Sequence, residues 1–278
     1  MGFRCHAVHP TSFTIGFKSF DERAFHLAKI IIAPQFCGPP DSGNGGYVCG
    51  VLAKDFDGPA TAVLRARVPL GHAMDLRLED GAMLLTDADG ALIGKSQPGD
   101  KALLPTPPEP PSLRAAIAAS QNYVGHTQRV HPTCFSCGPE RREGDGLRVF
   151  AGQIAGAPAG HVACGWTPHM DFADPQGLVP TEVIWAALDC PGVFAWIARE
   201  GRHGALLGTM TGEVLRRPPA GHEYIVTAWP LEREGRKETA GVALFTMDGE
   251  LLARAHQVWI MMGPRPDAKA ATSASATA

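Results

Sequence analysis

The sequence predicts an α+β protein made of two similar units in tandem, each with one helix and an antiparallel set of strands. Three observations support this prediction. In the first 97 residues a strand pattern is followed by a short helix pattern and then by several alternating runs. A proline-rich stretch at 98–111 then interrupts the chain. Motifs of the first half recur after this stretch.

The first unit opens with a strand pattern at 25–32, which is apolar, rich in β-branched residues and ended by Pro34. Asn44-Gly45-Gly46 then precedes an apolar run at 47–53 that predicts a short helix. Further runs typical of strands follow at 61–68, 72–78, 82–86 and 91–96.

The segment 98–111 contains Leu-Pro-Thr-Pro-Pro-Glu-Pro-Pro, which favours an extended chain and excludes a helix or a central strand. Ser112 is a typical cap for a helix at 113–124. We therefore expect an N-terminal unit at 1–97, a linker with a connecting helix at 98–130, a C-terminal unit at 131–263 and a disordered tail at 264–278.

The second unit repeats short motifs of the first. Arg67-Val-Pro-Leu-Gly-His72 corresponds to Arg217-Pro-Pro-Ala-Gly-His222, and Asp89-Gly-Ala-Leu-Ile-Gly-Lys95 corresponds to Asp248-Gly-Glu-Leu-Leu-Ala-Arg254. Both pairs fall at the same place in a series of strands and turns, and the second copy is longer by a hairpin at 232–237. This repetition predicts a tandem duplication.

One acid stands in the apolar helical run that starts after Gly177. Asp189 is surrounded there by apolar residues, and a buried acid is costly unless it is paired or used in chemistry. Pro191 and Gly192 follow, so we expect the helix to bend or stop beside the acid. A structural alternative is that this carboxylate hydrogen-bonds backbone loosened by Pro191.

Composition excludes several classes of protein. A formal net charge of -3 gives no general attraction to nucleic acid. The N-terminus lacks the apolar core of a signal peptide, and no run approaches the length of a membrane span, so we expect a cytoplasmic protein that binds neither nucleic acid nor membrane. Seven irregularly spaced cysteines fit reduced thiols. Nucleophile-elbow, phosphate-loop and dinucleotide-binding motifs are absent from the sequence.

The order of these motifs resembles that of the hotdog-fold acyl-CoA thioesterases, in the double-hotdog arrangement where one chain carries two units. Asn44-Gly45-Gly46 is similar to the His-Gly-Gly that starts the central helix in the phenylacetic-acid-pathway type, with Asn in place of His. Asp189 stands at the matching distance along the helix of the other copy. Cys134-Phe-Ser-Cys-Gly-Pro139, followed by Leu147, resembles a loop of related proteins, and 208–221 resembles the long central strand and its turn. The resemblance covers most of 25–262 and implies, for each unit, an antiparallel sheet wrapped around a central helix.

The resemblance also implies an active site between the two units. The helix-terminal amides of Gly45 and Gly46 would hold the thioester carbonyl oxygen, which becomes more negative as it is attacked. Asn44 would either face the substrate or serve only as a turn residue or N-cap before the helix. Asp189 would act as a general base on water or attack directly to form an anhydride. Ala53 stands opposite Asp189 in the repeat, so we expect one working site in each chain. Relatives of this kind also suggest a homo-oligomer.

Other residues are weaker candidates for binding an acyl-CoA or acyl-carrier substrate, and each also has an ordinary structural role. Glu182 suits the first turn of a helix, and the threonines suit strands. Exposed arginines usually form a solvated surface, although they can meet the phosphates of coenzyme A. The candidates are Thr181, Glu182, Trp185, Thr209, Thr211, Arg216 and Arg217.

The stretch His131-Pro-Thr-Cys134-Phe-Ser-Cys137 has a spacing found in zinc sites, with His126 or His169 as a possible fourth ligand. A second pair of cysteines at this spacing is missing from the sequence. We therefore predict no metal and no redox cofactor.

Two other functions stay open at this level. A hotdog enoyl-CoA hydratase or dehydratase would share the fold, but the Asp and His pair of its hydratase loop is not found in this sequence. A non-catalytic acyl-CoA-binding protein would keep the fold and lose the chemistry.

Overall fold

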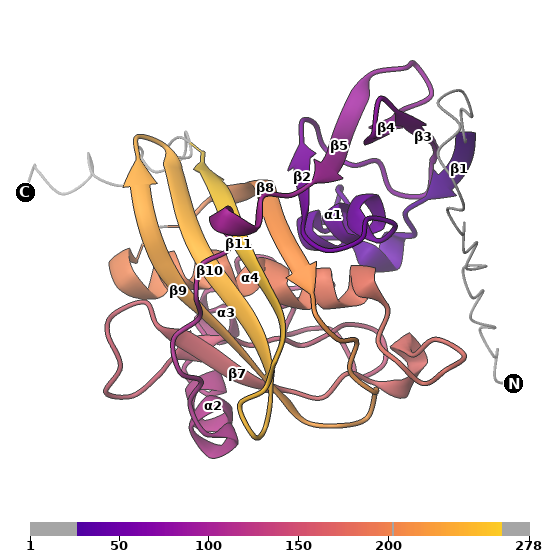
Figure 1. Cartoon of the computed structure of the whole chain (residues 1–278). Coiled ribbons are helices and arrows are strands. Elements are labelled where there is room, and N and C mark those ends of the chain that lie inside the picture. The colour runs from indigo at the N-terminus through magenta and orange to yellow at the C-terminus, as the bar shows by residue number, and fades with distance from the viewer. Residues whose placement is uncertain (1–26, 202, 263–278) are drawn as a thin grey trace, which may run out of the picture.

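The computed structural model describes residues 27–201 and 203–262, and it confirms the predicted α+β architecture (Figure 1). The predicted tail and the start of the first strand pattern lie outside these residues. In the N-terminal half the elements are β1 (Leu27–Ile31), the 3-10 turn η1 (Pro34–Phe36), α1 (Gly45–Ala53), β2 (Ala60–Leu64), β3 (Ala73–Glu79), β4 (Ala82–Thr86) and β5 (Leu92–Pro98).

The connecting segment and the C-terminal half contain longer elements. The connection holds η2 (Lys101–Leu103), α2 (Leu113–Ser120) and α3 (Gly125–Gln128). The C-terminal half holds β6 (Gly152–Gln153), β7 (Val162–Trp166), η3 (Met170–Phe172), α4 (Thr181–Glu200), β8 (Ala205–Val214), β9 (Tyr224–Glu234), β10 (Lys237–Thr246) and β11 (Leu251–Met261).

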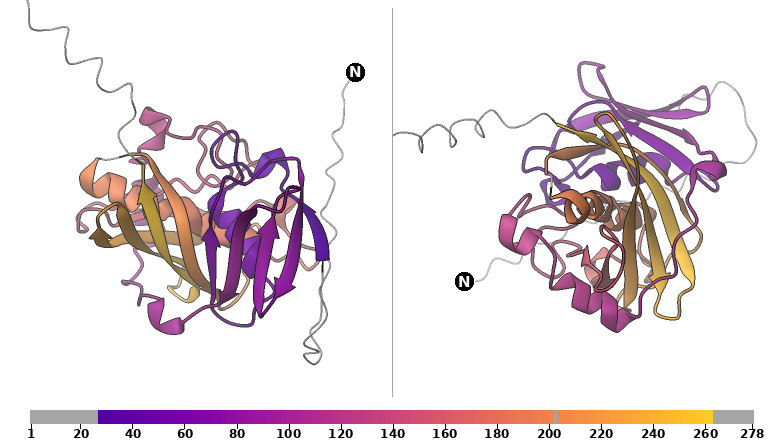
Figure 2. Two further views of the ribbon diagram at one scale, coloured as in Figure 1. Left: turned by 90° about the horizontal axis from the view of Figure 1, so that it is seen from above. Right: turned by 90° about the vertical axis from the view of Figure 1, so that its left-hand side faces the viewer.

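All these strands belong to one 11-stranded sheet in the order β1-β3-β4-β5-β2-β8-β11-β10-β9-β7-β6. The two halves join where β2 pairs antiparallel with β8. Thr61 lies opposite Thr211 in this register, and their hydroxyl oxygens are 2.9 Å apart. Figure 2 shows the resulting sheet running from the indigo and purple strands into the orange and yellow ones.

The strand order reveals the same plan in both halves. On one side of the join the order is β1-β3-β4-β5-β2, and on the other β7-β9-β10-β11-β8 follows the same sequence of connections. Each half also has a helix between its first two principal strands, α1 or α4. The repeated Arg-to-His motifs precede β3 and β9, and the longer hairpin of the second copy joins β9 to β10 around Gly235. The topology therefore agrees with the predicted duplication.

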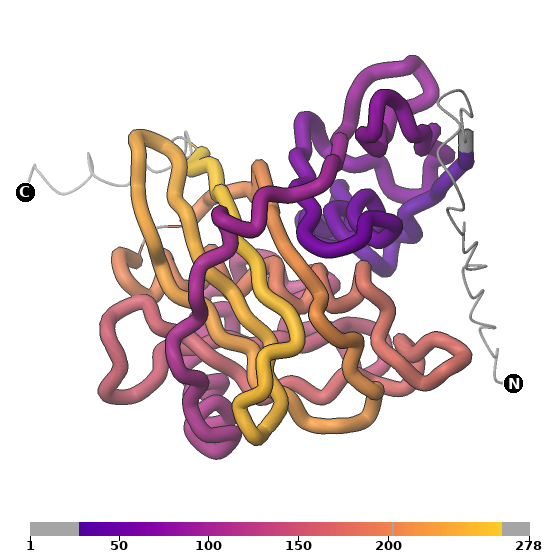
Figure 3. Tube along the Cα trace, viewed as in Figure 1, coloured from indigo at the N-terminus to yellow at the C-terminus, as the bar shows by residue number. Residues whose placement is uncertain are grey.

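The connecting segment runs along the outside of the molecule. Figure 3 shows it crossing the front of the C-terminal strands on its way from β5 to α2. Arg254 Nη1 donates a hydrogen bond of 3.4 Å to the carbonyl oxygen of Pro105, which attaches the segment to β11. Ser112 caps α2 as predicted, because its Oγ accepts from the Ala115 N–H. The predicted helix at 113–124 is shorter in the structure, where α2 ends at Ser120.

The helices α1 and α4 lie antiparallel and in close contact. A Cβ atom added at Gly46 would lie 2.5 Å from both the Cβ of Asp189 and the carbonyl oxygen of Trp185. A Cβ atom at Gly50 would lie 2.5 Å from the Cα of Glu182. Glycine is therefore required at both positions because the second helix occupies the space of a side chain.

The long helix α4 forms the centre of the core, and the sheet curves around it (Figure 2). By length and composition alone it would be able to cross a membrane, but 78% of its most apolar window is buried inside the protein. Its apolar surface is thus used in packing.

The prediction that the helix could stop at Pro191 is wrong. The helix α4 continues past Pro191 to Glu200, and Gly201 follows it in a left-handed conformation. The region around Pro191 is supported by β11. The Gln257 Nε2 group donates to the carbonyl oxygens of Leu188 at 2.7 Å and Asp189 at 3.0 Å. Position 192 must be glycine, since a Cβ atom at Gly192 would overlap the side-chain amide of Gln257.

Replacing Gln257 with methionine is expected to lower the free energy of unfolding by about 1–3 kcal/mol, because a side chain of similar size would leave buried carbonyl groups and the Trp259 N–H without their partner. Urea denaturation measures this change. Gln176→Met, at an exposed turn, is the matched control and should change stability by less than about 0.5 kcal/mol. Equal stability of the two variants would contradict the supporting role.

Candidate functional site

Asp189 meets the start of α1 inside the protein. Asp189 is only 3% exposed, and its Oδ2 atom accepts two hydrogen bonds. Asn44 Nδ2 donates one at 2.8 Å, and the Gly46 N–H donates the other at 3.0 Å. The structure thus brings together one residue from the C-terminal half and two from the N-terminal half.

These contacts exclude the structural alternative for Asp189. Its carboxylate does not turn back toward the backbone near Pro191 but points across to the other helix. A carboxylate is favoured at a helix N-terminus, where the unpaired N–H groups carry partial positive charge.

Asn44 is held in a fixed orientation by its role as the N-cap of α1. Its Oδ1 atom accepts from the Tyr47 N–H at 2.9 Å, which is the usual bond of an N-cap side chain. Because the amide oxygen faces the helix, the amide nitrogen faces Asp189. The same nitrogen lies 3.7 Å from the Sγ atom of Cys134.

The second carboxylate oxygen of Asp189 is in an unusual position. Its Oδ1 atom is buried and has no hydrogen-bond partner among residues 27–201 and 203–262. Burial raises the pKa of Asp189 from its ordinary value to about 7, against the bond from Gly46, which lowers the pKa. Buried polar atoms in native proteins are nearly always paired, so an unpartnered carboxylate oxygen indicates a functional group.

The N–H groups at the start of α1 are already largely used within the protein. Gly46 donates to Asp189, Tyr47 to the Asn44 side chain and Val48 to the Asn44 carbonyl oxygen. The remaining N–H of the first turn belongs to Gly45, which lines the cavity beside Asp189. We predicted that the N–H groups of both Gly45 and Gly46 face a substrate. In the structure only the Gly45 N–H remains for this role, because the Gly46 N–H donates to Asp189 in the closely packed helix pair.

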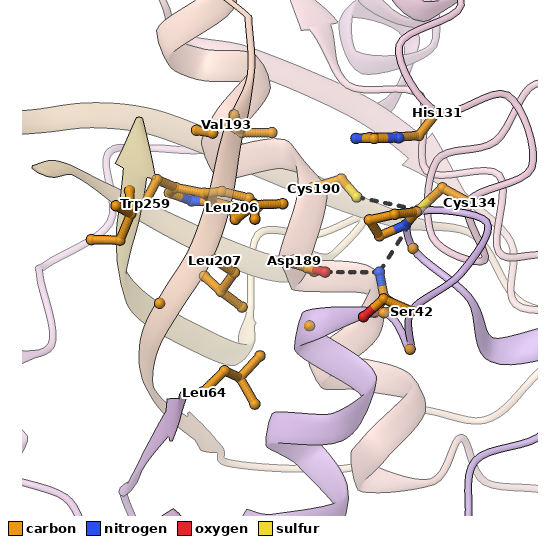
Figure 4. Close-up of a pocket in the computed structure, with 18 of the residues that line it drawn as sticks. Ser42, Leu64, His131, Cys134, Asp189, Cys190, Val193, Leu206, Leu207 and Trp259 are labelled. Atoms are coloured by element: carbon orange, nitrogen blue, oxygen red, sulfur yellow. Dashed lines mark hydrogen bonds between the residues drawn. The ribbon is translucent and has the colours of Figure 1, made fainter. Parts of the chain in front are cut away.

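A cavity of about 460 Å³ opens beside Asp189, a size typical of small-molecule sites. One wall is apolar, and Figure 4 shows its side chains across from Asp189. They come from β2, β8, α4 and β11 and are Leu64, Leu206, Leu207, Val193 and Trp259. Arg65 and Arg67 also line the cavity and are exposed to solvent.

Sequence patterns did not reveal these lining residues. Leu64 and Leu207 share a cavity because β2 pairs with β8, a contact between segments far apart in the chain. Ser42 also lines the cavity and was missed, and its Oγ atom accepts from the N–H of Val68, another lining residue. The only available signal was the serine in the turn just before Asn44.

The residues predicted to bind substrate do not line this cavity. The reason is the antiparallel packing of the two helices, which places Thr181 and Glu182, at the start of α4, by the end of α1. Trp185 is buried against Gly212. Thr209 lies on β8 at a second pocket, while Thr211 bonds to Thr61.

The two predicted arginines are used in ion pairs. Arg216 pairs with Glu250 at 2.5 Å, and Arg217 pairs with Asp174 at 2.7 Å. Arg217 is partly buried, and both pairs lie away from the cavity around Asp189. An exposed pair such as that of Arg216 contributes little to stability and is an ordinary surface contact.

The position related to Asp189 by the duplication is occupied by Ala53. Each is the ninth residue of its helix, counted from Gly45 in α1 and from Thr181 in α4. Ala53 is buried, and its methyl group cannot act as an acid or a base. The described structure thus agrees with an asymmetric arrangement in which one of two related positions carries a carboxylate.

Three thiols gather behind Asn44. The Sγ atoms of Cys134, Cys137 and Cys190 all lie within 4.8 Å of one another and are buried. The histidines predicted as a fourth ligand are used elsewhere: His126 packs on the rings of Tyr123 and Phe150, and His169 Nδ1 accepts from the Asp171 N–H. All cysteines among the described residues are free thiols.

Comparison with solved structures identifies the fold. The chain is similar to a TesB protein from Mycobacterium avium subs paratuberculosis, with a TM-score of 0.57, 14% identity, and coverage of 85% of this chain and 93% of that one. An acyl-CoA thioesterase II from Mycobacterium marinum matches with a TM-score of 0.55, 11% identity, and coverage of 86% and 93%.

A conserved protein of unknown function with a hot dog fold, from Alicyclobacillus acidocaldarius, matches with a TM-score of 0.51, 12% identity, and coverage of 89% of this chain and 96% of that one. No family model matches the chain, and no curated protein matches it by sequence. At such low identity the likeness shows the fold, which is a tandem hotdog, as the sequence motifs predicted.

Proposed function

We propose that this protein hydrolyses the thioester bond of acyl-CoA substrates, giving a carboxylic acid and a free thiol, at the site formed by Asp189 and the start of α1. The observation that carries the proposal is the buried Asp189 carboxylate, with one oxygen bonded to Asn44 and Gly46 and the other without a partner among the described residues, beside a cavity of suitable size. Thioesterase names among the structural neighbours support it.

Each group has a defined role in this reaction. The thioester carbonyl oxygen accepts a hydrogen bond from the Gly45 N–H, where the partial positive charge of the helix end stabilises the negative charge that develops during attack. Oδ1 of Asp189 either takes a proton from an attacking water molecule or attacks the carbonyl carbon itself. In both routes the carbon–sulfur bond breaks, the thiolate leaves and is protonated, and water supplies the new carboxylate oxygen.

The walls of the cavity support an acyl-CoA as the substrate class. The apolar side chains of Leu64, Leu206 and Leu207 suit an acyl group. Arg65 lines the same cavity and is exposed, as a group that meets the phosphates of coenzyme A must be, whereas Arg67 on the same wall pairs with Asp41. Arg65 replaces Arg216 and Arg217 in this role. Cytoplasmic location and assembly into a homo-oligomer stay predictions.

A thiol-release assay over short, long and aromatic acyl-CoAs tests the proposal, and release is expected with at least one class. Tight binding of acyl-CoA without release from any thioester would instead support a non-catalytic binding protein. Hydration of an enoyl-CoA, followed as loss of its ultraviolet absorbance, would support the alternative function of an enoyl-CoA hydratase.

Asn44→Ser separates the two roles of Asn44, since serine can still cap α1 but has no amide to donate to Asp189. We expect kcat/KM for thioester hydrolysis to fall about 10- to 100-fold, the value of a hydrogen bond to a charged group. Asn44→Ala is the comparison and should also lower the free energy of unfolding by about 1 kcal/mol through loss of the cap. Full activity of Asn44→Ser would exclude a role for the amide donor.

A further inference from the structure

The three buried thiols come from two parts of the chain. Cys134 and Cys137 lie in the loop between α3 and β6, and Cys190 lies on α4 directly after Asp189. The Sγ atoms of Cys134 and Cys190 are 3.7 Å apart. Zinc–sulfur bonds of about 2.3 Å in a tetrahedron place neighbouring sulfur atoms about 3.8 Å apart. The spacing of the thiols therefore matches one edge of a tetrahedral zinc site.

The loop that carries two of these thiols has a tight backbone turn. The Gly138 N–H donates to the carbonyl oxygen of Cys134 at 2.8 Å, and a Cβ at Gly138 would lie 2.5 Å from that same oxygen. Asn44 Nδ2 also donates to the Cys134 sulfur at 3.7 Å. Such bonds orient a metal-binding thiolate and offset its negative charge.

His131 is the candidate for a fourth ligand, although its ring nitrogens do not lie within 4.8 Å of all three sulfur atoms. It lies three residues before Cys134 and lines the same cavity as Cys134 and Cys190. Figure 4 shows its ring on the side of the pocket where the two sulfur atoms lie. An imidazole together with three thiolates is one of the usual ligand sets of structural zinc.

We propose that Cys134, Cys137 and Cys190, completed by His131, bind one zinc ion. Binding displaces the thiol protons and needs no oxidant. The ion would fasten the loop of Cys134 to α4 beside Asp189, and Asn44 Nδ2, 3.7 Å from the Cys134 sulfur, would link it to the site. This departs from the absence of a metal predicted from the sequence, where His131, Cys134 and Cys137 stand close together but Cys190 lies more than fifty residues away.

Metal analysis of the full-length chain, purified under reducing conditions without chelator, tests the proposal. We expect about one zinc ion per chain in the wild type and about a tenth or less in Cys137→Ser and Cys190→Ala. Cys164→Ala is the matched control, because Cys164 is equally buried but lies on β7, outside the thiol cluster, and it should keep its zinc. Less than about a tenth of an ion in the wild type, also after incubation with zinc, would overturn the proposal.

Cobalt substitution of the wild-type protein provides a second measurement that does not depend on how well the cysteine variants fold. Wild-type protein freed of metal and titrated with Co²⁺ should develop the absorption bands of a tetrahedral cobalt–thiolate site, and these should change in His131→Ala. Unchanged bands in that variant would exclude His131 as the fourth ligand. A disulfide between Cys134 and Cys190 in the purified protein, with no metal uptake after reduction, would overturn the whole assignment. Neither readout depends on thioester hydrolysis, so the zinc site and the proposed function can fail separately.

Discussion

Asp189→Asn is expected to lower kcat for thioester hydrolysis about 10²- to 10⁴-fold, the usual contribution of a positioned general base or nucleophile. The asparagine oxygen can still accept the bonds from Asn44 Nδ2 and the Gly46 N–H, so the helix contact should survive. The amide nitrogen would then replace Oδ1, the oxygen proposed to act on water or on the carbonyl carbon. Thiol-release kinetics on the purified variant measure the loss.

Glu182→Gln is the matched control, because it removes a carboxylate from the same helix at a position outside the cavity. We expect its kcat to stay within about twofold of the wild type, since Glu182 is half-buried at the far end of the helix contact and does not line the cavity. Urea denaturation of both variants checks that folding is preserved. Equal loss of activity in the two variants, or full activity of Asp189→Asn, would remove Asp189 from the proposed mechanism.

The same chemistry distinguishes the two routes open to Asp189. If its carboxylate attacks the thioester, repeated turnover in ¹⁸O-labelled water should place the label in the Asp189 side chain, because water then opens an anhydride that contains it. If Asp189 acts as a base, the label should appear only in the released acid. Mass spectrometry of the peptide that carries Asp189 decides between these outcomes.

The central pair of the site was predictable because each member carries a local signal. Asp189 is an acid in an apolar helical run, and Asn44 precedes two glycines at the start of a helix. The duplication then placed them in opposite halves, and the structure shows them 2.8 Å apart. Patterns of this kind survive in sequence because burial and capping restrict the residue types that a position accepts.

The rest of the site depends on contacts between distant segments. Leu64 and Leu207 meet only because β2 pairs with β8, and Cys190 joins Cys134 only because α4 passes behind the loop. Arg216 looked like a phosphate ligand because it is basic, but its partner Glu250 lies 34 residues away in the chain. The effect of Pro191 on the helix was also predicted wrongly. The Gln257 side chain on β11 bonds to the helix backbone near Pro191, and no pattern near Pro191 in the sequence indicates this contact.

Gly46→Ala tests the close helix contact on which this site depends. An added methyl group would lie 2.5 Å from both the Asp189 Cβ and the Trp185 carbonyl oxygen, and backbone cannot move aside as easily as a side chain. We expect the free energy of unfolding to fall by about 1–3 kcal/mol, as for other overpacked cores. Urea denaturation measures this loss.

The same substitution should also reduce thioester hydrolysis strongly, because pushing the helices apart lengthens the bond from the Gly46 N–H to Asp189. Gly45→Ala is the control, since its methyl group would meet the Leu207 side chain at 3.1 Å, and a leucine can shift. It should therefore cost less stability than Gly46→Ala. If the two alanine variants were equally stable and equally active, the helix contact would not be what positions the carboxylate, and the asymmetry between Asp189 and Ala53 would need another explanation.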